Sequence, residues 1–392
     1  MKAVEDQTTA DSGSNDPGEC PPKAKKALRI SMVGVKGLPH PGGIEIAVQE
    51  VGRRLVQRGH QVNVYVRPHY TPKSSREFLG MRLVNLPSIP TKHLDAFTHA
   101  FVATLHAMWE GVDVLQLESI GFSPFAVPLR LRRIKTVVRS HGLDWQRKKW
   151  GVFAKSYLRA ADCGAIYLPD ATTVVSRKLQ QYYENHFGRP VIYIPNGVNV
   201  SPQVAPQKIL DLGLQGGDYI FFASRLVPEK GLHYLLQAYK QLRNPSKKLV
   251  IAGDANYKSP YANEMKAEAN ENILFLGFAT GQLLQELLSW AYVYVLPSEI
   301  EGLSIGLLEA MAYGNCVLVS DIEENLEAVG DSGLSFKSGD VPDLKEKLEQ
   351  LLASEDLVRQ YREKAQGHVH QHYNWDRVTD QYENLYQGLI GK

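Results

Sequence analysis

The stretch Pro297-Ser-Glu-Ile-Glu301-Gly-Leu-Ser-Ile-Gly-Leu-Leu-Glu309-Ala-Met-Ala-Tyr-Gly314 decides the fold of this chain. It lies between two apolar runs, residues 292–296 and 316–320, which predict buried strands. The order strand, loop, helix, strand is typical of parallel α/β sheets, where ligands bind at the carboxyl ends of strands. Glu301 in the loop and Glu309 in the helix are therefore candidate ligand-binding carboxylates.

The start of the predicted helix is suited to an anion. Leu303, Ser304 and Ile305 are expected to open it, and their free N–H groups would point at a phosphate. Glu309 lies further along among leucine, alanine and methionine, where a carboxylate needs a partner. A solvated helix face is the alternative, but these apolar neighbours argue against it. The layout fits phosphate in the middle of a ligand and hydroxyls at its ends, as in a nucleotide diphosphate sugar.

Two further loops follow predicted strands. Arg225 and Lys230 come after the run 219–223, and two cations at a strand end suit a phosphate, although surface cations are common anywhere. Gly42 and Gly43 follow the first predicted strand and allow the backbone to approach a ligand closely, although a plain tight turn would also use them.

Candidate residues also follow two other predicted strands. His141 comes after the run 136–139 and would lie at the rim of a cleft, although a lone histidine is usually structural. Gly277 and Phe278 follow the run 273–276. No G-x-G-x-x-G pattern opens the chain, which argues against a dinucleotide-dependent oxidoreductase.

Together these motifs resemble the large family 4 of retaining glycosyltransferases, over roughly residues 28–390. The stretch from Glu301 to Glu309 resembles the family's E-x7-E motif, and Arg225 with Lys230 resembles the R-x-x-x-x-K pattern that neutralises the donor diphosphate. Many members carry a proline where this chain has Cys316.

The resemblance implies an α/β protein of the GT-B fold, with two Rossmann-like parallel-sheet domains facing each other across a cleft. It implies four catalytic residues, His141, Arg225, Lys230 and Glu301. It implies donor binding by Gly42, Gly43, Gly277, Phe278, Leu303, Ser304, Ile305 and Glu309. In this family the GG loop lies near the donor phosphates, the histidine contacts the donor sugar and the Gly-Phe loop borders the nucleobase.

The implied function is transfer of a sugar, with retention, from a nucleotide diphosphate sugar to a hydroxyl acceptor. Residues 42–45 and 142–147 resemble bacterial members that assemble surface polysaccharides or lipid-linked glycans. The alternatives are a non-catalytic nucleotide-sugar-binding protein and a transferase with a soluble acceptor. The chain has no D-x-D pair, so we expect no metal ion and no other cofactor.

Length predicts more than one domain, because 392 residues are too many for one ordinary core. We expect a disordered polar tail at 1–26, an N-terminal acceptor domain at 27–200, a linker at 201–217, a donor domain at 218–373 and a C-terminal helix at 374–392 that packs back toward the first domain. The tail has no apolar core of a signal peptide, and three scattered cysteines favour a reducing compartment.

Charge is divided unevenly along the chain. Residues 1–200 hold 27 Lys and Arg against 16 Asp and Glu, and residues 121–160 hold ten basic residues and one acid. Aromatic residues lie among them, so Arg147, Lys148, Lys149 and Trp150 form a candidate patch for an anionic membrane surface or an anionic soluble acceptor. We expect a cytoplasmic protein, peripheral on the membrane face, with no nucleic-acid partner.

Overall fold

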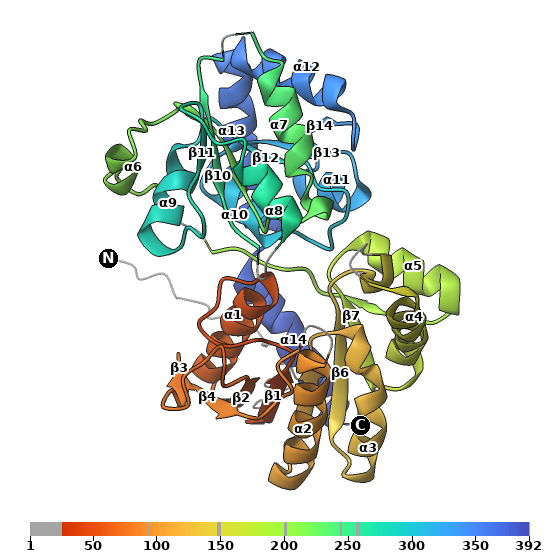
Figure 1. The fold of residues 1–392 in the computed structure, drawn as a ribbon. Helices are drawn as coiled ribbons and strands as arrows, with labels where there is room; N and C mark the ends of the chain where they lie inside the picture. Colours follow the sequence, from red (N-terminus) through yellow and green to blue (C-terminus); the bar gives the residue numbers. More distant parts are fainter. Residues whose placement is uncertain are drawn as a thin grey trace, which may run out of the picture.

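The structure is a computed structural model that describes residues 26–91, 94–146, 150–199, 202–243, 245–255 and 259–391. Two parallel sheets, each covered by helices, stand one above the other, as Figure 1 shows. The fold class expected from the sequence, two Rossmann-like domains, is confirmed. Residues 1–25 of the predicted tail, and Arg147, Lys148 and Lys149 of the predicted patch, lie outside the described residues.

The N-terminal sheet has its first strand near the centre, so chain segments that follow it feed helices to either face. All its pairings are parallel except the edge pair β3 and β4. In sheet order the strands are β3 (Glu77–Phe78), β4 (Met81–Asn85), β2 (Gln61–Val66), β1 (Arg29–Val33), β5 (Val114–Leu117), β6 (Lys135–Ser140), β7 (Ala171–Val174) and β8 (Ile192–Tyr193).

Helices cover both faces of this sheet and bury its apolar strands. One core lies under α1 (Gly43–Gln57) and α14 (Trp375–Ile390). The other lies under α2 (Asp95–Glu110), η1 (Ile120–Phe125), α3 (Ala126–Leu131) and α4 (Val152–Tyr167). The short η2 (Asp144–Gln146) precedes α4, and α5 (Arg177–Phe187) follows β7.

The C-terminal sheet is wholly parallel. Its order is β11 (Ile273–Phe275), β10 (Lys248–Ala252), β9 (Tyr219–Ala223), β12 (Val293–Leu296), β13 (Cys316–Ser320) and β14 (Leu334–Phe336). One face packs on α9 (Gly281–Trp290), α10 (Ile305–Ala312), α11 (Glu323–Val329) and α13 (Glu355–His372). The other packs on α7 (Leu232–Lys240), α8 (Pro260–Lys266) and α12 (Val341–Leu352), and η3 (Pro228–Lys230) precedes α7.

The chain crosses between the domains twice, and the crossings lie side by side. The amide of Val198 donates to the carbonyl of Tyr373 at 2.8 Å. After the second crossing α14 lies against α1, where Arg54 bonds Asp376 at 2.8 Å and Trp375 is fully buried. Within the segment expected as a linker, α6 (Lys208–Asp211) packs against α9. No helix within the described ranges has the length and hydropathy needed to span a bilayer.

Candidate active site

The carboxylate of Glu301 lies in the loop after β12 and is paired. Lys230 donates to it at 2.5 Å, and both side chains are largely buried. Gly231 makes this approach possible, because its φ is +69° and an added Cβ would lie 1.9 Å from the carbonyl oxygen of Pro297. The loops after β9 and β12 therefore pack backbone to backbone and bring the two predicted motifs together.

The helix α10 begins two residues later than expected. Ser304 is its N-cap and accepts from the amide of Leu307 at 3.3 Å, so the first helical residue is Ile305. Leu303 precedes the helix, and its carbonyl accepts a hydrogen bond from Asn196 at 2.8 Å. The expectation that all three residues open the helix was wrong for the first two, because the serine hydroxyl caps the helix.

Cations from the two domains lie close to one another around Lys36. Burial lowers the pKa of Lys36, and the nearby charges of Arg225 and Arg67 lower it further against the opposing charge of Glu45. Lys36 belongs to the loop after β1 in the first domain, whereas Arg225 follows β9 in the second. Like charges held this close favour an anion between them.

His141 follows β6 and is oriented by a buried carboxylate. Its Nε2 lies 2.8 Å from Glu118, which is fully buried, and Arg139 lies 3.9 Å from the same oxygen. Burial would raise the pKa of Glu118, but the bond to His141 and the charge of Arg139 hold it below its ordinary value. Burial lowers the pKa of His141. A neutral ring would donate through Nε2 to the carboxylate of Glu118, which leaves Nδ1 as its acceptor nitrogen.

A chain of buried hydrogen bonds continues from Glu118 through the first domain. Gln116 donates to Glu118, and Tyr386 of α14 donates to Gln116. Arg139 donates to Asn196 at 2.9 Å, at the crossing between domains. The histidine is thus fixed by residues from the sheet, the C-terminal helix and the interdomain crossing.

The domains touch at the site itself. A Cβ added to Gly302 would lie 2.0 Å from the carbonyl oxygen of His141, so only glycine allows these two backbones to meet. Gly43, the first residue of α1, lies opposite Ile305, the first residue of α10, at ordinary contact distance for an added Cβ. The structure therefore brings the predicted residues of the two domains side by side.

Glu309 faces a cavity of about 350 Å³ between the domains. The cavity is bordered by Glu50 of α1, Leu284 of α9 and Trp375 of α14. Burial and then the negative charge of Glu50 raise the pKa of Glu309 to about 7. The ionised form of Glu309 is therefore destabilised, and hydrogen bonds from hydroxyl groups of a ligand would stabilise it.

The two predicted glycine loops have different local contacts. Gly42 is the N-cap of α1, and an added Cβ would meet the Glu45 carboxylate at 2.0 Å, which itself accepts from the Lys36 amide at 2.9 Å. Gly277 has a φ of +66° and accepts from the amide of the residue after β10, Gly253, at 2.6 Å. Phe278 beside it is about half exposed, an available aromatic surface at a strand end.

Sequence reasoning missed four residues of this site: Lys36, Glu118, Arg139 and Asn196. Each lies at or just beyond the carboxyl end of a strand in the first domain. A polar residue that ends an apolar run in a parallel sheet was the available signal. This signal is weak for a single residue. The hydrogen bonds that bring these residues together join positions up to 57 apart, which a sequence does not show.

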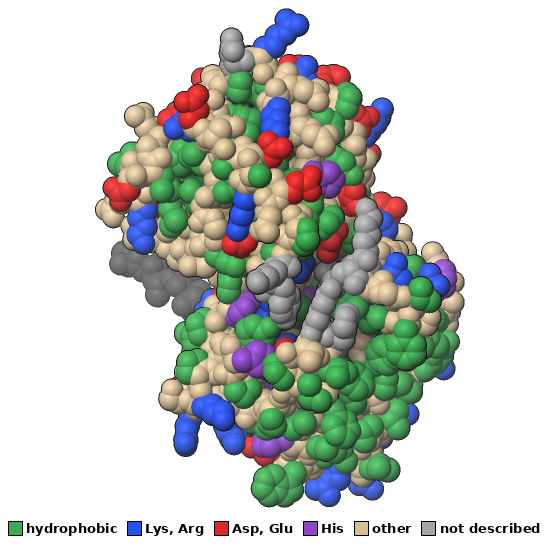
Figure 2. Space-filling view, in the orientation of Figure 1, with side chains coloured by type: hydrophobic (Ala, Val, Ile, Leu, Met, Phe, Trp, Pro, Cys, Tyr) green, Lys and Arg blue, Asp and Glu red, His purple; other side chains and the backbone are tan. Residues whose placement is uncertain are grey.

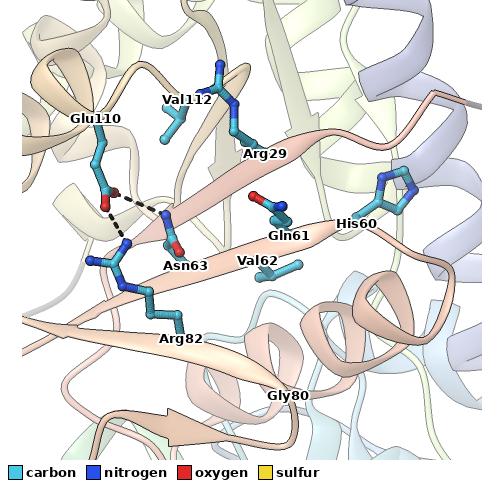
Figure 3. A pocket seen from close by; sticks show the side chains of 9 residues that line it. All are labelled: Arg29, His60, Gln61, Val62, Asn63, Gly80, Arg82, Glu110 and Val112. Atoms are coloured by element: carbon cyan, nitrogen blue, oxygen red, sulfur yellow. Dashed lines mark hydrogen bonds and ion pairs between the residues drawn. The ribbon is translucent and has the colours of Figure 1, made fainter.

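A larger cavity, about 440 Å³, lies away from this site. Figure 3 shows it at the amino ends of β1, β2 and β4, with Arg82 and Asn63 both bonded to Glu110. Its other arginine, Arg29, pairs with Asp113. No predicted site residue lines this cavity.

Comparisons with known proteins find relatives of both domains. The model of the family described as "Glycosyl transferases group 1" matches residues 211–368, and that of "Glycosyltransferase Family 4" matches residues 41–202. Sucrose-phosphate synthase from Thermosynechococcus elongatus is similar in structure, with a TM-score of 0.79, 20% identity and coverage of 92% of this chain and 99% of that one. Anabaena HepE in complex with UDP and glucose has a TM-score of 0.78, 18% identity and coverage of 92% and 100%.

Curated relatives extend along nearly the whole chain. An uncharacterized glycosyltransferase of Methanocaldococcus jannaschii is 24% identical over 92% of this chain and 98% of its own length. The phosphatidyl-myo-inositol mannosyltransferase of Mycolicibacterium smegmatis is 27% identical over 93% and 95%. The family matches and the fold thus define a sugar-transferring enzyme of the GT-B class. The chain belongs to the group 1 glycosyltransferases.

Proposed function

We propose that this enzyme moves a sugar from a nucleotide diphosphate sugar to a hydroxyl acceptor with retention of anomeric configuration. The observation that carries the proposal is the Lys230–Glu301 pair, which brings a cation and a carboxylate to one point of the cleft at 2.5 Å. Anabaena HepE, which is similar in structure, binds UDP-glucose in a crystal structure.

The donor would be held by charge at its centre and by hydroxyl contacts at its ends. Arg225, Lys230 and Lys36 supply cations for the diphosphate from the two domains. Glu301 would accept from hydroxyls of the transferred sugar once Lys230 turns to the phosphate. Glu309 would accept from the ribose in the 350 Å³ cavity. Charge-assisted hydrogen bonds of this kind contribute about 1.5–3 kcal/mol each.

The transfer needs no protein nucleophile. The bond from the anomeric carbon to the donor phosphate oxygen breaks, and the electron pair leaves with the nucleoside diphosphate. The acceptor oxygen bonds the same carbon from the same face, and its proton passes to the departing phosphate oxygen. The Nδ1 atom of His141 would accept a hydrogen bond from a hydroxyl of the donor sugar, because Nε2 is hydrogen-bonded to Glu118. Arg225 and Lys230 would stabilise the charge on the leaving group.

Metal independence is part of the proposal. Many sugar transferases neutralise the diphosphate with a divalent ion held by paired aspartates. The sequence contains no D-x-D pair. In this proposal Lys36, Arg225 and Lys230 would neutralise the diphosphate directly, and the proximity of Lys36 to Arg225 supports it.

The acceptor we propose is lipid-linked, in surface polysaccharide or other glycan assembly. The curated relative from Mycolicibacterium smegmatis is named for mannosyl transfer to phosphatidyl-myo-inositol, a lipid. A lipid-linked acceptor would hold the enzyme on the cytoplasmic face of a membrane. Of the predicted basic patch, Trp150 is described and partly buried beside α4.

Slow donor hydrolysis without acceptor tests the proposal. The purified enzyme is incubated in excess EDTA with UDP-, GDP-, ADP- and dTDP-sugars, and the released sugar is followed by proton NMR. We expect one donor class to be hydrolysed and the first anomer released to match the donor. Glu301→Gln should lower that rate about 30–150-fold, the kinetic equivalent of one lost charged hydrogen bond.

Two results would contradict the proposal. Release of the opposite anomer first would show inversion. Donor binding with no turnover of any donor, with or without added lipid extract, would instead indicate a binding protein. Glu363→Gln, an exposed carboxylate on α13, is the matched control and should leave the rate unchanged.

A further inference from the structure

The helix α2 presents apolar side chains outward. Phe97, Phe101, Leu105 and Trp109 recur every four residues, and their exposure rises from 38% to 83% along the helix. The opposite side of α2, with Ala100 and its neighbours, is buried against the sheet. A surface helix ordinarily turns polar residues to water, so an apolar outer side on this scale indicates a docking surface.

The outer side of α2 continues onto the neighbouring helices. Phe97 contacts Phe125 of η1, with ring centroids 5.2 Å apart, and Tyr157 of α4 at 6.0 Å. Exposed apolar residues then extend over α3 and the start of α4, where Leu131 and Phe153 are 83% and 89% exposed. We call this surface the apolar face; its members are Phe97, Phe101, Leu105, Trp109, Val127, Leu131, Val152 and Phe153. Figure 2 shows hydrophobic side chains gathered over these helices.

The charges beside the apolar face have one sign. Arg130, Arg132 and Arg133 are exposed around Leu131 at the end of α3. The carboxylates of these helices are withdrawn from solvent or paired. Asp95 is buried with Arg67, Glu110 pairs with Arg82, and Asp162 is buried with two tyrosines. Exposed cations beside apolar and aromatic side chains complement an anionic lipid surface.

We propose that the apolar face docks on an anionic phospholipid leaflet, with Trp109, Leu131 and Phe153 inserted at the boundary between headgroups and acyl chains. A second copy of this chain is a poorer occupant, because the three arginines would face their own counterparts. The inference rests on the proposed lipid-linked acceptor for its purpose. Trp109 and Leu131 lie at the ends of α2 and α3, and Phe153 lies at the start of α4.

Vesicle flotation tests the proposal with protein alone. The full chain is mixed with vesicles of phosphatidylcholine, with and without phosphatidylglycerol, and the bound fraction is measured. We expect binding to phosphatidylglycerol vesicles, and a loss of about tenfold or more in Trp109→Ser/Leu131→Ser/Phe153→Ser. The matched control is Ile192→Ser/Leu210→Ser, two exposed apolar residues elsewhere, which should bind as the wild type does. All five side chains are exposed, so folding should survive.

Three results would overturn the proposal. The first is a wild type that does not float with phosphatidylglycerol vesicles, and the second is a triple variant that floats as well as the wild type. The third is a dimer of the wild type in sedimentation velocity without lipid that is absent in the triple variant, which would make the apolar face a self-association surface. Arg132→Glu should weaken flotation and reduce its dependence on phosphatidylglycerol.

Donor-induced thermal shift separates this inference from the proposed function. The triple variant should keep the wild-type shift, because its changes lie outside the cleft. If the triple variant no longer floats but keeps the donor-induced thermal shift, its defect lies in membrane docking and not in donor binding. A wild type that floats but shows no donor response would count against the proposed function and leave membrane docking supported.

Discussion

Burial beside Glu50 raises the pKa of Glu309 to about 7 from an ordinary value of 4.5. The folded state therefore binds a proton that the unfolded chain releases, and stability falls as pH rises from about 4.5 to about 7. Glutamine cannot ionise, so Glu309→Gln removes this penalty. We predict a higher melting temperature for the variant near pH 8, equivalent to about 3 kcal/mol, and little difference near pH 4.5.

The same substitution should weaken donor binding by about tenfold or more, since the ribose would lose a charged acceptor. Thermal melts at the two pH values and donor titration measure the two effects on one protein. If Glu309→Gln and the wild type melt at the same temperature at each pH and bind the donor equally well, Glu309 does not face the ligand. Glu363→Gln again serves as control.

His141 and Glu118 should respond differently to substitution. His141→Ala removes a partly exposed ring, and we predict a loss of about 10–100-fold in kcat with a small change in stability. Glu118→Gln leaves Arg139 buried without its counter-charge, so we predict a loss of several kcal/mol of stability as well.

The test compares the loss of kcat and the loss of unfolding free energy between the two variants. Urea unfolding and kinetics are run on each variant, with His141→Asn to keep a hydrogen-bonding group. A Glu118→Gln protein as stable as the wild type would mean that the buried carboxylate does not balance the arginine.

Residues of the C-terminal motifs could be predicted because each motif is continuous in sequence. Arg225, Lys230, Glu301 and Glu309 all lie within two short stretches, and the structure pairs Lys230 of one stretch with Glu301 of the other. Lys36 and Asn196 could not be predicted, because their roles depend on the approach of the other domain. Roles in catalysis and donor binding remain predictions for all of them.

At the scale of elements, a single glycine lets the loop before α10 meet the end of β6. An alanine at Gly302 would place its Cβ 2.0 Å from the carbonyl oxygen of His141, and backbone cannot yield as a flexible side chain can. We predict that Gly302→Ala holds the domains apart and weakens donor binding by about tenfold or more, whereas each domain stays folded.

Small-angle scattering and donor titration check this prediction together. Gly388→Ala, in α14 where an added Cβ meets nothing within 4 Å, is the control and should be neutral or stabilising by up to about 1 kcal/mol. A Gly302→Ala protein with wild-type radius of gyration and wild-type donor affinity would contradict the close contact.

Strands with long apolar runs were predicted from the sequence. The runs at 219–223 and 316–320 coincide with β9 and β13. The edge strands β3, of two residues, and β14, of three, were not predicted, because such runs are too short to show a period. The outward apolar side of α2 was missed for another reason: a helix apolar on two sides loses the one-sided pattern that identifies it.

At the scale of the whole molecule, the site is assembled from two domains. The N-terminal domain contributes Lys36 and His141, the C-terminal domain contributes Arg225, Lys230 and Glu301, and Asn196 joins them at the crossing. The sequence indicated two domains by its length and its repeated strand–helix pattern. How they meet could not be predicted, because it depends on contacts between residues more than 100 positions apart.

The proposed cationic clamp has a consequence for metal dependence. If Lys36, Arg225 and Lys230 neutralise the diphosphate, donor turnover in excess EDTA should equal turnover with added Mg²⁺ or Mn²⁺. Initial rates at matched ionic strength measure this, because exposed charges are screened by salt. If activity disappears in EDTA and returns when the ion is added, a metal ion, and not the three cations, neutralises the diphosphate.

The most direct test of the account is calorimetric titration of the proposed donors in EDTA. It compares the wild type with Lys230→Ala, from the C-terminal domain, and Lys36→Ala, from the N-terminal domain. We predict that one nucleotide diphosphate sugar binds the wild type and that each variant binds it about tenfold or more weakly, since each loses a cation facing the same diphosphate. Wild-type affinity in both variants, or binding that requires a divalent ion, would contradict a diphosphate held between the two domains by their own lysines.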